Sequence, residues 1–316
     1  MEPAPQHDAH LIASENRSWL GRVTCGWKKP ELDLENVLRY WRDVHSPSIA
    51  RRPGIWEYRH FQFDPVRSEL FVTDPGPDPA IQFACPADEQ LMWTSDVRYA
   101  SQAGLDAFGA EPTPEIRGHL LGDIDLIVDQ STTYRVVEEL GRTYVDRSGR
   151  AEPQGAPDRP TFALFLRRRG DEAAFRALLG EVATRWAADP EVIRLRLSLF
   201  EAPDMAAERA SGYPIKTHPP ERQYQAWIDL TVADEAALTR LVAGAGLGRE
   251  VSVLHAYPVR AIYTSNRDGR PTFVGLRGFP AYAALTALGG YNQAHPSILR
   301  WMYGDIAAGV ELEAAA

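Results

Sequence analysis

Cysteine is scarce in this sequence, which has two, Cys25 and Cys85, among 316 residues. Two thiols cannot build a disulfide framework, and without a clustered histidine they are too few for a structural zinc site. Long apolar runs are lacking as well, because segments such as 125–128 and 161–166 fall far short of the roughly 20 residues that a membrane span requires. We therefore expect reduced thiols and no contact with a membrane.

Positive charge is also in deficit, with 34 Lys and Arg against 43 Asp and Glu and a formal net charge of -9. Nucleic-acid binding needs a basic face, so no nucleic-acid partner is expected. Residues 1–17 have no apolar core of signal-peptide length, which favours a cytoplasmic location. The aromatic content, with 8 Trp and 12 Tyr, favours a small-molecule substrate as the partner.

The first half of the chain has the pattern of a β-α-β-β-α-β unit. Leu34, Val37, Leu38 and Trp41 recur at three- and four-residue steps, which predicts a helix from residue 34 that ends near Pro53. Strands are predicted at 19–27, 55–63, 80–93 and 131–138, and further helices at 97–108 and 113–121. A loop rich in Pro, Asp and Gly is expected at 64–79.

The second half repeats this order after a Pro- and Gly-rich linker at 149–159. Strands are predicted at 161–168, 191–200, 223–232 and 251–264, and helices at 171–188 and 235–243. The expected organisation is an N-terminal extension (1–18), a first repeat (19–148), a second repeat (160–265) and a C-terminal helical extension (266–316), with a helical segment at 281–302.

The predicted fold class is therefore α+β, with two fused ferredoxin-like (βαββαβ) repeats. The sheet of such a unit has helices on one face and needs cover on the other. Two repeats in one chain can cover each other's bare faces, which predicts an intrachain α/β barrel of the dimeric type around a central cavity.

The segment Tyr-Trp-Arg-Asp-Val-His-Ser-Pro at 40–47, followed by Arg52-Pro53-Gly54 and the strand at 56–63, resembles the EthD-domain family of the dimeric α/β-barrel superfamily. Residues 93–96 and 123–129 are similar to the second half of the same module. The resemblance implies a ferredoxin-like fold that normally dimerises, and small-molecule decarboxylases, dehydratases and degradation proteins. The second repeat lacks the histidine motif, so we expect one site, in a monomer or a homodimer.

His45 is the first catalytic candidate. It lies four residues after Trp41, so the two share the helical face that should meet the sheet. A histidine there suits proton transfer as a general acid or base, and Trp41 would contact the substrate. The structural alternative is a histidine that satisfies carbonyl groups at the helix C-terminus.

Alternation along the strand at 55–63 supplies the next candidates. It places Trp56, Tyr58, His60 and Gln62 on one face, and Phe61 and Phe63 on the other. We expect the first set to line the barrel cavity, with His60 and Tyr58 catalytic and Trp56 and Gln62 binding substrate, and the phenylalanine face to pack under the helices. The alternative is an aromatic core with one hydrogen-bonded histidine.

Further substrate-binding candidates lie on later predicted strands or in the tail, and the alternative for each is a wall, turn or helix-cap residue. They are Trp93, Tyr134, Trp227, Asp229, His255, Tyr257 and Asn292.

Common cofactor and nucleophile signatures are missing from the sequence. It has no Gly-rich phosphate loop, no G-x-S-x-G elbow and no H-E-x-x-H. We therefore predict no metal and no cofactor, with heme as the alternative because some barrel relatives bind it through one histidine. The predicted function is a cofactor-independent lyase, dehydratase or isomerase acting on a hydrophobic or aromatic small molecule. The alternatives are a cofactor-free oxygenase of an activated phenol and a non-catalytic binding protein.

Overall fold

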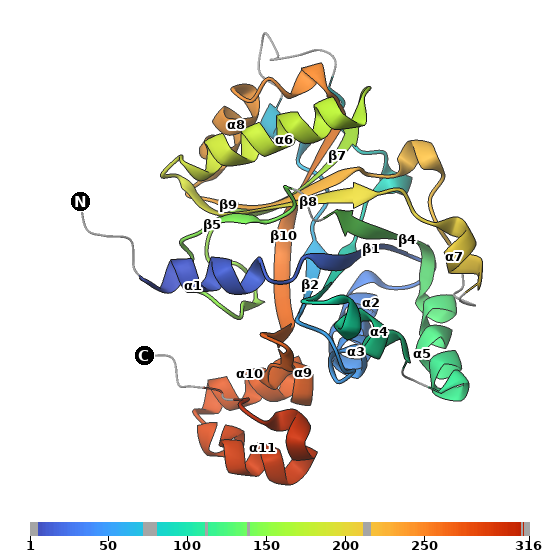
Figure 1. Ribbon diagram of the computed structural model, residues 1–316, viewed down its shortest axis with the longest axis vertical. Coiled ribbons are helices and arrows are strands. Elements are labelled where there is room, and N and C mark those ends of the chain that lie inside the picture. The colour runs from blue at the N-terminus through green and yellow to red at the C-terminus, as the bar shows by residue number, and fades with distance from the viewer. Residues whose placement is uncertain are drawn as a thin grey trace.

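The structure is a computed structural model that describes residues 6–71, 81–110, 113–137, 140–210, 216–310 and 312 (Figure 1). Residues 72–80, which include the second half of the predicted loop and the start of the predicted third strand, lie outside this description.

The first repeat is a four-stranded antiparallel sheet with helices on one face. Its strands pair in the order β4-β1-β3-β2, the order of a ferredoxin-like unit. The elements are β1 (Leu20–Lys28), α2 (Leu34–Tyr40), the π-helical turn η1 (Trp41–His45), α3 (Ser46–Ala50), β2 (Glu57–Phe63), β3 (Trp93–Tyr99), α4 (Gln102–Ala110), α5 (Pro114–Ile127) and β4 (Val128–Val137).

The second repeat has the same element order and the same sheet, in the order β10-β7-β9-β8. Its elements are β7 (Thr161–Arg168), α6 (Glu172–Ala187), β8 (Val192–Glu201), α7 (Met205–Ala210), β9 (Ala226–Val232), α8 (Glu235–Ala243) and β10 (Val251–Arg267).

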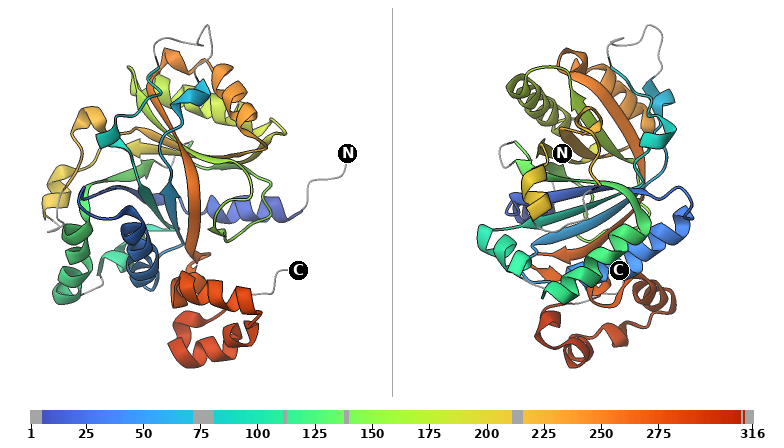
Figure 2. Two further views of the ribbon diagram at one scale, coloured as in Figure 1. Left: turned by 180° about the vertical axis from the view of Figure 1, so that it is seen from behind. Right: turned by 90° about the vertical axis from the view of Figure 1, so that its right-hand side faces the viewer.

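The two sheets close into one antiparallel barrel of eight strands. The long strand β10 joins them, because its first half pairs with β7 and its second half with β2. On the other side β4 pairs with β8, so the two junctions are equivalent. Helices of the two repeats cover opposite outer faces of the barrel (Figures 1 and 2). This confirms the predicted fold, with both halves of a dimeric-type α/β barrel in one chain.

Smaller elements decorate the barrel. Helix α1 (Gln6–Glu15) lies beside it and contacts β5 (Thr143–Asp146), which pairs with β8. Two short strands flank β10, β6 (Gln154–Gly155) and β11 (Arg270–Pro271). The 3-10 turns are η2 (Ser68–Phe71), η3 (Ala87–Glu89), η4 (Pro220–Arg222), η5 (Leu247–Arg249), η6 (Tyr291–Ala294) and η7 (Gly304–Ala307).

The C-terminal extension is a helical unit at one end of the molecule (Figure 1). It comprises α9 (Phe273–Arg277), α10 (Phe279–Leu288) and α11 (Pro296–Tyr303), where the sequence predicts one helical segment at 281–302. Phe273, Leu276 and Leu299 belong to a small core of its own. The unit packs on the helices of the first repeat, where the Arg42 guanidinium lies 4.6 Å from the ring of Phe279.

The third strand is the main error among the predicted elements. The sequence predicts it at 80–93, but β3 begins at Trp93, and residues 81–92 of the described chain form irregular backbone with the short turn η3. The predicted helix at 97–108 is displaced in the same direction, to Gln102–Ala110.

The barrel interior is filled by side chains in two layers. One layer is aromatic, and in it the Phe61 ring meets that of Trp227 across the barrel at 4.9 Å between centroids. The other layer is charged, and in it the Arg196 guanidinium donates to Glu57 at 2.8 Å. The predicted central hollow is therefore wrong, because large buried side chains from both sheets occupy the space.

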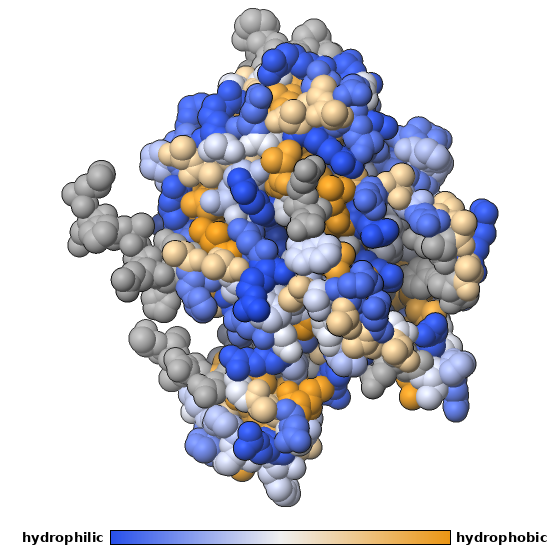
Figure 3. Space-filling view, in the orientation of Figure 1, coloured by the Kyte–Doolittle hydropathy of each residue, from blue (hydrophilic) through white to orange (hydrophobic). Residues whose placement is uncertain are grey.

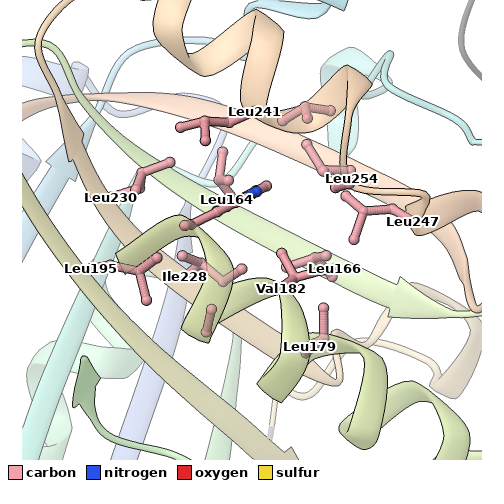
Figure 4. Close-up of a cluster of buried hydrophobic side chains, with 14 of the residues drawn as sticks. Leu164, Leu166, Leu179, Val182, Leu195, Ile228, Leu230, Leu241, Leu247 and Leu254 are labelled. Carbon is pink, nitrogen blue, oxygen red and sulfur yellow. The ribbon is translucent and has the colours of Figure 1, made fainter. Parts of the chain in front are cut away.

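The helix-covered face of the second repeat is filled as well. Figure 4 shows leucine, isoleucine and valine side chains of the sheet and of α6 interdigitating, among them Leu164, Leu179 and Leu195. Buried aliphatic side chains from the sheet and the helices thus occupy this face of the second repeat.

Hydrophilic residues predominate on the face drawn in Figure 3, with hydrophobic ones in small groups between them. Across the described residues, no helix is both long enough and apolar enough to cross a membrane.

Candidate functional site

The site lies between the sheet of the first repeat and its helices, in a cavity of about 640 Å³. This volume is within the range of small-molecule sites, about 300–1,000 Å³. The floor comes from β1, β3 and β4, and the walls from α3, α4 and α5. Exposed residues such as Arg22, Gln102 and Asp106 mark the side that opens to solvent.

Helix α2 begins at a capped turn, where the Asp33 carboxylate accepts a hydrogen bond from the backbone N–H of Asn36 at 2.9 Å. The helix continues through the π-turn at Trp41–His45, in which the N–H of Ser46 bonds to the carbonyl of Trp41. Both Trp41 and His45 are buried toward the sheet, with ring centroids 4.1 Å apart. The predicted shared face of these two residues is thus present.

His45 meets a carboxylate from the opposite wall. Its Nδ1 lies 2.7 Å from Oδ2 of Asp123 on α5. The carboxylate accepts the Nδ1–H bond and thereby fixes the ring as the tautomer whose Nε2 is free to accept a proton. Nε2 has no hydrogen-bond partner among the described residues, and the ring lies on the cavity wall.

Hydroxyl groups surround this pair. The Trp41 indole N–H donates to Oγ of Ser95 at 3.0 Å, and the Ser95 hydroxyl also forms a hydrogen bond with the Tyr58 hydroxyl. The Tyr58 hydroxyl lies 2.9 Å from Oγ of Ser46. Burial raises the pKa of Tyr58, which keeps the phenol neutral and able to donate.

Of the predicted site residues, the structure brings Trp41, His45 and Tyr58 together on the cavity wall. Trp93 lies directly behind Trp41, with ring centroids 5.1 Å apart. These residues stand on the helix-covered face of the sheet and not in the barrel.

The predicted faces of β2 are therefore exchanged. Tyr58, His60 and Gln62 point toward the helices, whereas Phe61 and Phe63 belong to the aromatic layer of the barrel. Gln62 donates to the carbonyl of Leu38 at 3.1 Å, and its amide nitrogen lies 3.2 Å from Nε2 of His60. Burial lowers the pKa of His60 to about 3. His60 is fully buried and does not line the cavity, so its predicted catalytic role has no support in the geometry.

The remaining predicted residues lie elsewhere. Tyr134, Trp227, His255 and Tyr257 are in the aromatic layer of the barrel, and Asp229 is in the charged layer, 3.1 Å from Nε of Arg194. Trp56 donates to the carbonyl of Ser14 at 3.0 Å, and Asn292 is exposed in the C-terminal extension. None of these seven residues lines the cavity.

The sequence prediction missed Asp123, Ser95, Tyr99 and Arg22. Asp123 and Ser95 lie within segments that contribute to the EthD resemblance, which was the one available signal for them. Tyr99 and Arg22 are ordinary strand residues, whose position on the cavity depends on the helices above them.

The sequence matches no protein-family model and no curated protein. Solved structures of similar architecture include an anthrone oxidase-like protein, with 9% identity over 81% of this chain and 96% of that chain and a TM-score of 0.45. A candidate monooxygenase from Fusobacterium nucleatum has 7% identity over 80% of this chain and 96% of that chain, and a TM-score of 0.43. A chlorite dismutase from Candidatus Nitrospira defluvii has 8% identity over 77% of this chain and 91% of that chain, and a TM-score of 0.35. Values this low transfer no activity, and EthD membership stays a prediction.

Metal and heme binding can be tested against the side chains present. Within the described parts of the chain, no group of three or more His, Cys, Asp and Glu residues gathers as a metal site. Heme needs a single axial histidine, and His45 is the histidine among the cavity-lining residues. Its Nδ1 contact with Asp123 is the support that axial histidines use, so Nε2 could hold the iron. When bound, heme would supply redox chemistry.

Proposed function

We propose that the cavity is the active site of an enzyme that moves a proton on a hydrophobic small molecule. The observation that carries this proposal is the contact of 2.7 Å between Nδ1 of His45 and Oδ2 of Asp123, on the wall of a cavity of ligand size. An oriented imidazole beside a carboxylate is the usual arrangement of a general base.

His45 would take a proton from a carbon next to a carbonyl group. Nε2 accepts the proton, the Asp123 carboxylate stabilises the imidazolium that forms, and the electron pair of the C–H bond moves to the carbonyl oxygen. The hydroxyl groups of Ser95 and Tyr58 are the donors available to that oxygen. Such placed donors in a water-poor site are the main source of catalysis in many enzymes.

The enolate then has two outcomes that need no further reactant. If His45 returns the proton to another carbon, the reaction is an isomerisation. If a β-hydroxyl leaves with the proton as water, the reaction is a dehydration, which is a lyase step. Dehydration is among the chemistries that the EthD resemblance implies. We propose a lyase, dehydratase or isomerase of this kind, in a cytoplasmic enzyme that works without a cofactor.

Deuterium exchange tests the proposal without a known substrate. Wild-type protein would be incubated in D2O with a panel of hydrophobic ketones and phenolic acids, and label uptake at the acidic carbon would be measured by mass spectrometry. We expect at least one compound to exchange, and His45→Gln to slow that exchange by about 100-fold or more.

His60→Gln is the matched control, because His60 comes from the same repeat but does not line the cavity. It should leave the exchange rate within about threefold of the wild type. Equal exchange by wild type and His45→Gln, or no exchange with any compound, would overturn the proposal. Oxygen uptake would assign an oxygenase, tight binding without turnover would assign a carrier, and a Soret band in the purified protein would assign heme.

A further inference from the structure

The end of the cavity away from His45 carries positive charge. Arg22 on β1 is exposed at the rim and has no ion-pair partner in the described part of the chain. Arg117 on α5 donates to the backbone carbonyl of Gly109 at 3.0 Å, and not to a carboxylate. Together with Arg52 they outnumber the one acidic residue of the lining, Asp106.

The Tyr99 hydroxyl lies at the same end. Its side chain is 1% exposed and lines the cavity, and the hydroxyl has no hydrogen-bond partner among the described residues. Burial raises the pKa of Tyr99, and the nearby charges of Arg22 and Arg52 oppose this rise. A buried neutral hydroxyl without a partner is costly, so a ligand acceptor would stabilise it.

The two polar ends of the cavity are separated along β3. Ser95, Val97 and Tyr99 point to the same face of the strand and all line the cavity. At about 3.3 Å per residue, Ser95 and Tyr99 are about 13 Å apart. Apolar side chains fill the interval, among them Val97 and Leu105.

We propose that the cavity binds an elongated, mainly apolar molecule with one carboxylate, which docks on Arg22 and Tyr99. This inference rests on the proposed function for the other end, where His45 would act on the distal part of the same molecule. The carboxylate would accept a charge-assisted bond from Arg22 and a hydrogen bond from Tyr99. A neutral analogue would lack the negative charge that pairs with Arg22, so it should bind more weakly than the carboxylate.

Calorimetric titration with a pair of rigid probes tests the docking end. Anthracene-2-carboxylate should bind at least about 10-fold more tightly than anthracene-2-methanol, since a charge-assisted bond outweighs a neutral one. Arg22→Gln and Tyr99→Phe should each lower the affinity for the carboxylate probe by about 10-fold. Each should change the affinity for the alcohol probe by less than about twofold.

Arg135→Gln is the matched control. Arg135 is paired with Arg22 in the strand register and is exposed, but it does not line the cavity. If Arg135→Gln lowered the affinity for the carboxylate probe as much as Arg22→Gln does, the effect would be one of general charge, and the proposed docking site would be overturned. Equal affinity for the two probes, or no binding of either to folded wild-type protein, would overturn it as well.

The two proposals fail separately. His45→Gln and Asp123→Asn should keep the preference for the carboxylate probe, because neither residue is at the docking end. A retained preference without deuterium exchange would reject proton transfer and leave the docking site standing. Deuterium exchange without a preference for the carboxylate probe would reject the docking site and leave proton transfer standing.

Discussion

At the scale of single residues, two histidines of the first repeat differ by their surroundings. His45 faces the cavity and is held by Asp123, whereas His60 is enclosed beside Gln62. Burial lowers the pKa of His60 to about 3 from an ordinary value of 6.5. One ring is thus available to a ligand, and the other is a core group that stays neutral.

The low pKa of His60 predicts a dependence of stability on pH. Below pH 6.5 the unfolded chain binds a proton that the folded protein rejects until about pH 3. The contribution of the neutral His60 ring to the free energy of unfolding is therefore fully present above pH 6.5. It falls by about 1.4 kcal/mol per pH unit as the pH decreases from 6.5 toward 3. The free energy of unfolding would be measured in urea at pH 6, 5 and 4. Its decrease per pH unit should be smaller by this amount in His60→Gln than in the wild type. An equal pH dependence in the two proteins would contradict the burial of a neutral ring.

The orientation of single side chains was only partly predictable. The four-residue step placed Trp41 and His45 on one face, as the stacked rings show. Alternation on β2 identified the two sets of side chains but assigned each to the wrong side, because all seven residues of the strand are buried. A strand covered on both faces has no polar face to reveal its orientation.

At the scale of elements, the roof of the cavity depends on a close backbone contact. Gly54, in the turn before β2, has a φ of +84°, and a Cβ there would lie 2.0 Å from the carbonyl oxygen of Gly104 in α4. The turn therefore sets the position of α4, which carries Leu105 and Phe108 of the cavity lining.

Substitution of this glycine should be costly. Gly54→Ala should lower the free energy of unfolding by about 3 kcal/mol or more, from the left-handed backbone and the clash together. Gly149→Ala is the matched control, since Gly149 has a φ of +65° but open space around it, and should cost about 1 kcal/mol. If urea unfolding showed a similar loss of stability in Gly54→Ala and Gly149→Ala, the result would contradict the close contact between the turn and α4.

Element boundaries followed the strength of the local pattern. The strand at 161–168 and the helix at 235–243 were predicted correctly, since each has continuous apolar periodicity and clear flanking signals. The strand predicted at 80–93 failed because apolar residues such as Phe83 and Leu91 pack from irregular backbone onto two different cores. Periodicity does not distinguish such a segment from a strand.

At the scale of the whole molecule, a buried ionic layer joins the two repeats. Glu15 of α1 accepts from Arg59 of the first repeat at 2.6 Å and from Arg194 of the second at 3.0 Å. Burial opposes ionisation of Glu15, but Arg194 and Arg59 outweigh it and hold the pKa of the carboxyl well below its ordinary value. One carboxylate thus links the N-terminal helix to both halves of the barrel.

Loss of this carboxylate should destabilise the whole fold. Glu15→Ala removes the carboxylate that pairs with two buried guanidinium groups, those of Arg59 and Arg194. It should lower the free energy of unfolding, measured in urea, by about 3–5 kcal/mol. Glu172→Ala, at a half-exposed surface pair with Arg168, should cost less than about 1 kcal/mol. A Glu15→Ala loss no larger than this control would contradict the linking role.

The repeated element order in the sequence was enough to predict the closed barrel. It was not enough to place the site, because the two available spaces, inside the barrel and under the helices, are both lined by aromatic and polar residues. Side-chain volume decides between them, and the barrel is filled while the first repeat keeps a cavity. The predicted boundaries at 19–148 and 160–265 stay a prediction.

The location of a bound ligand tests the central claim most directly. A crystal structure with 6-bromo-2-naphthoate would locate the probe by the anomalous signal of its bromine. We predict a bromine peak between the first sheet and α3–α5, within contact distance of the His45 ring or the cavity walls. A peak inside the barrel, among Phe61 and Trp227, would contradict the account.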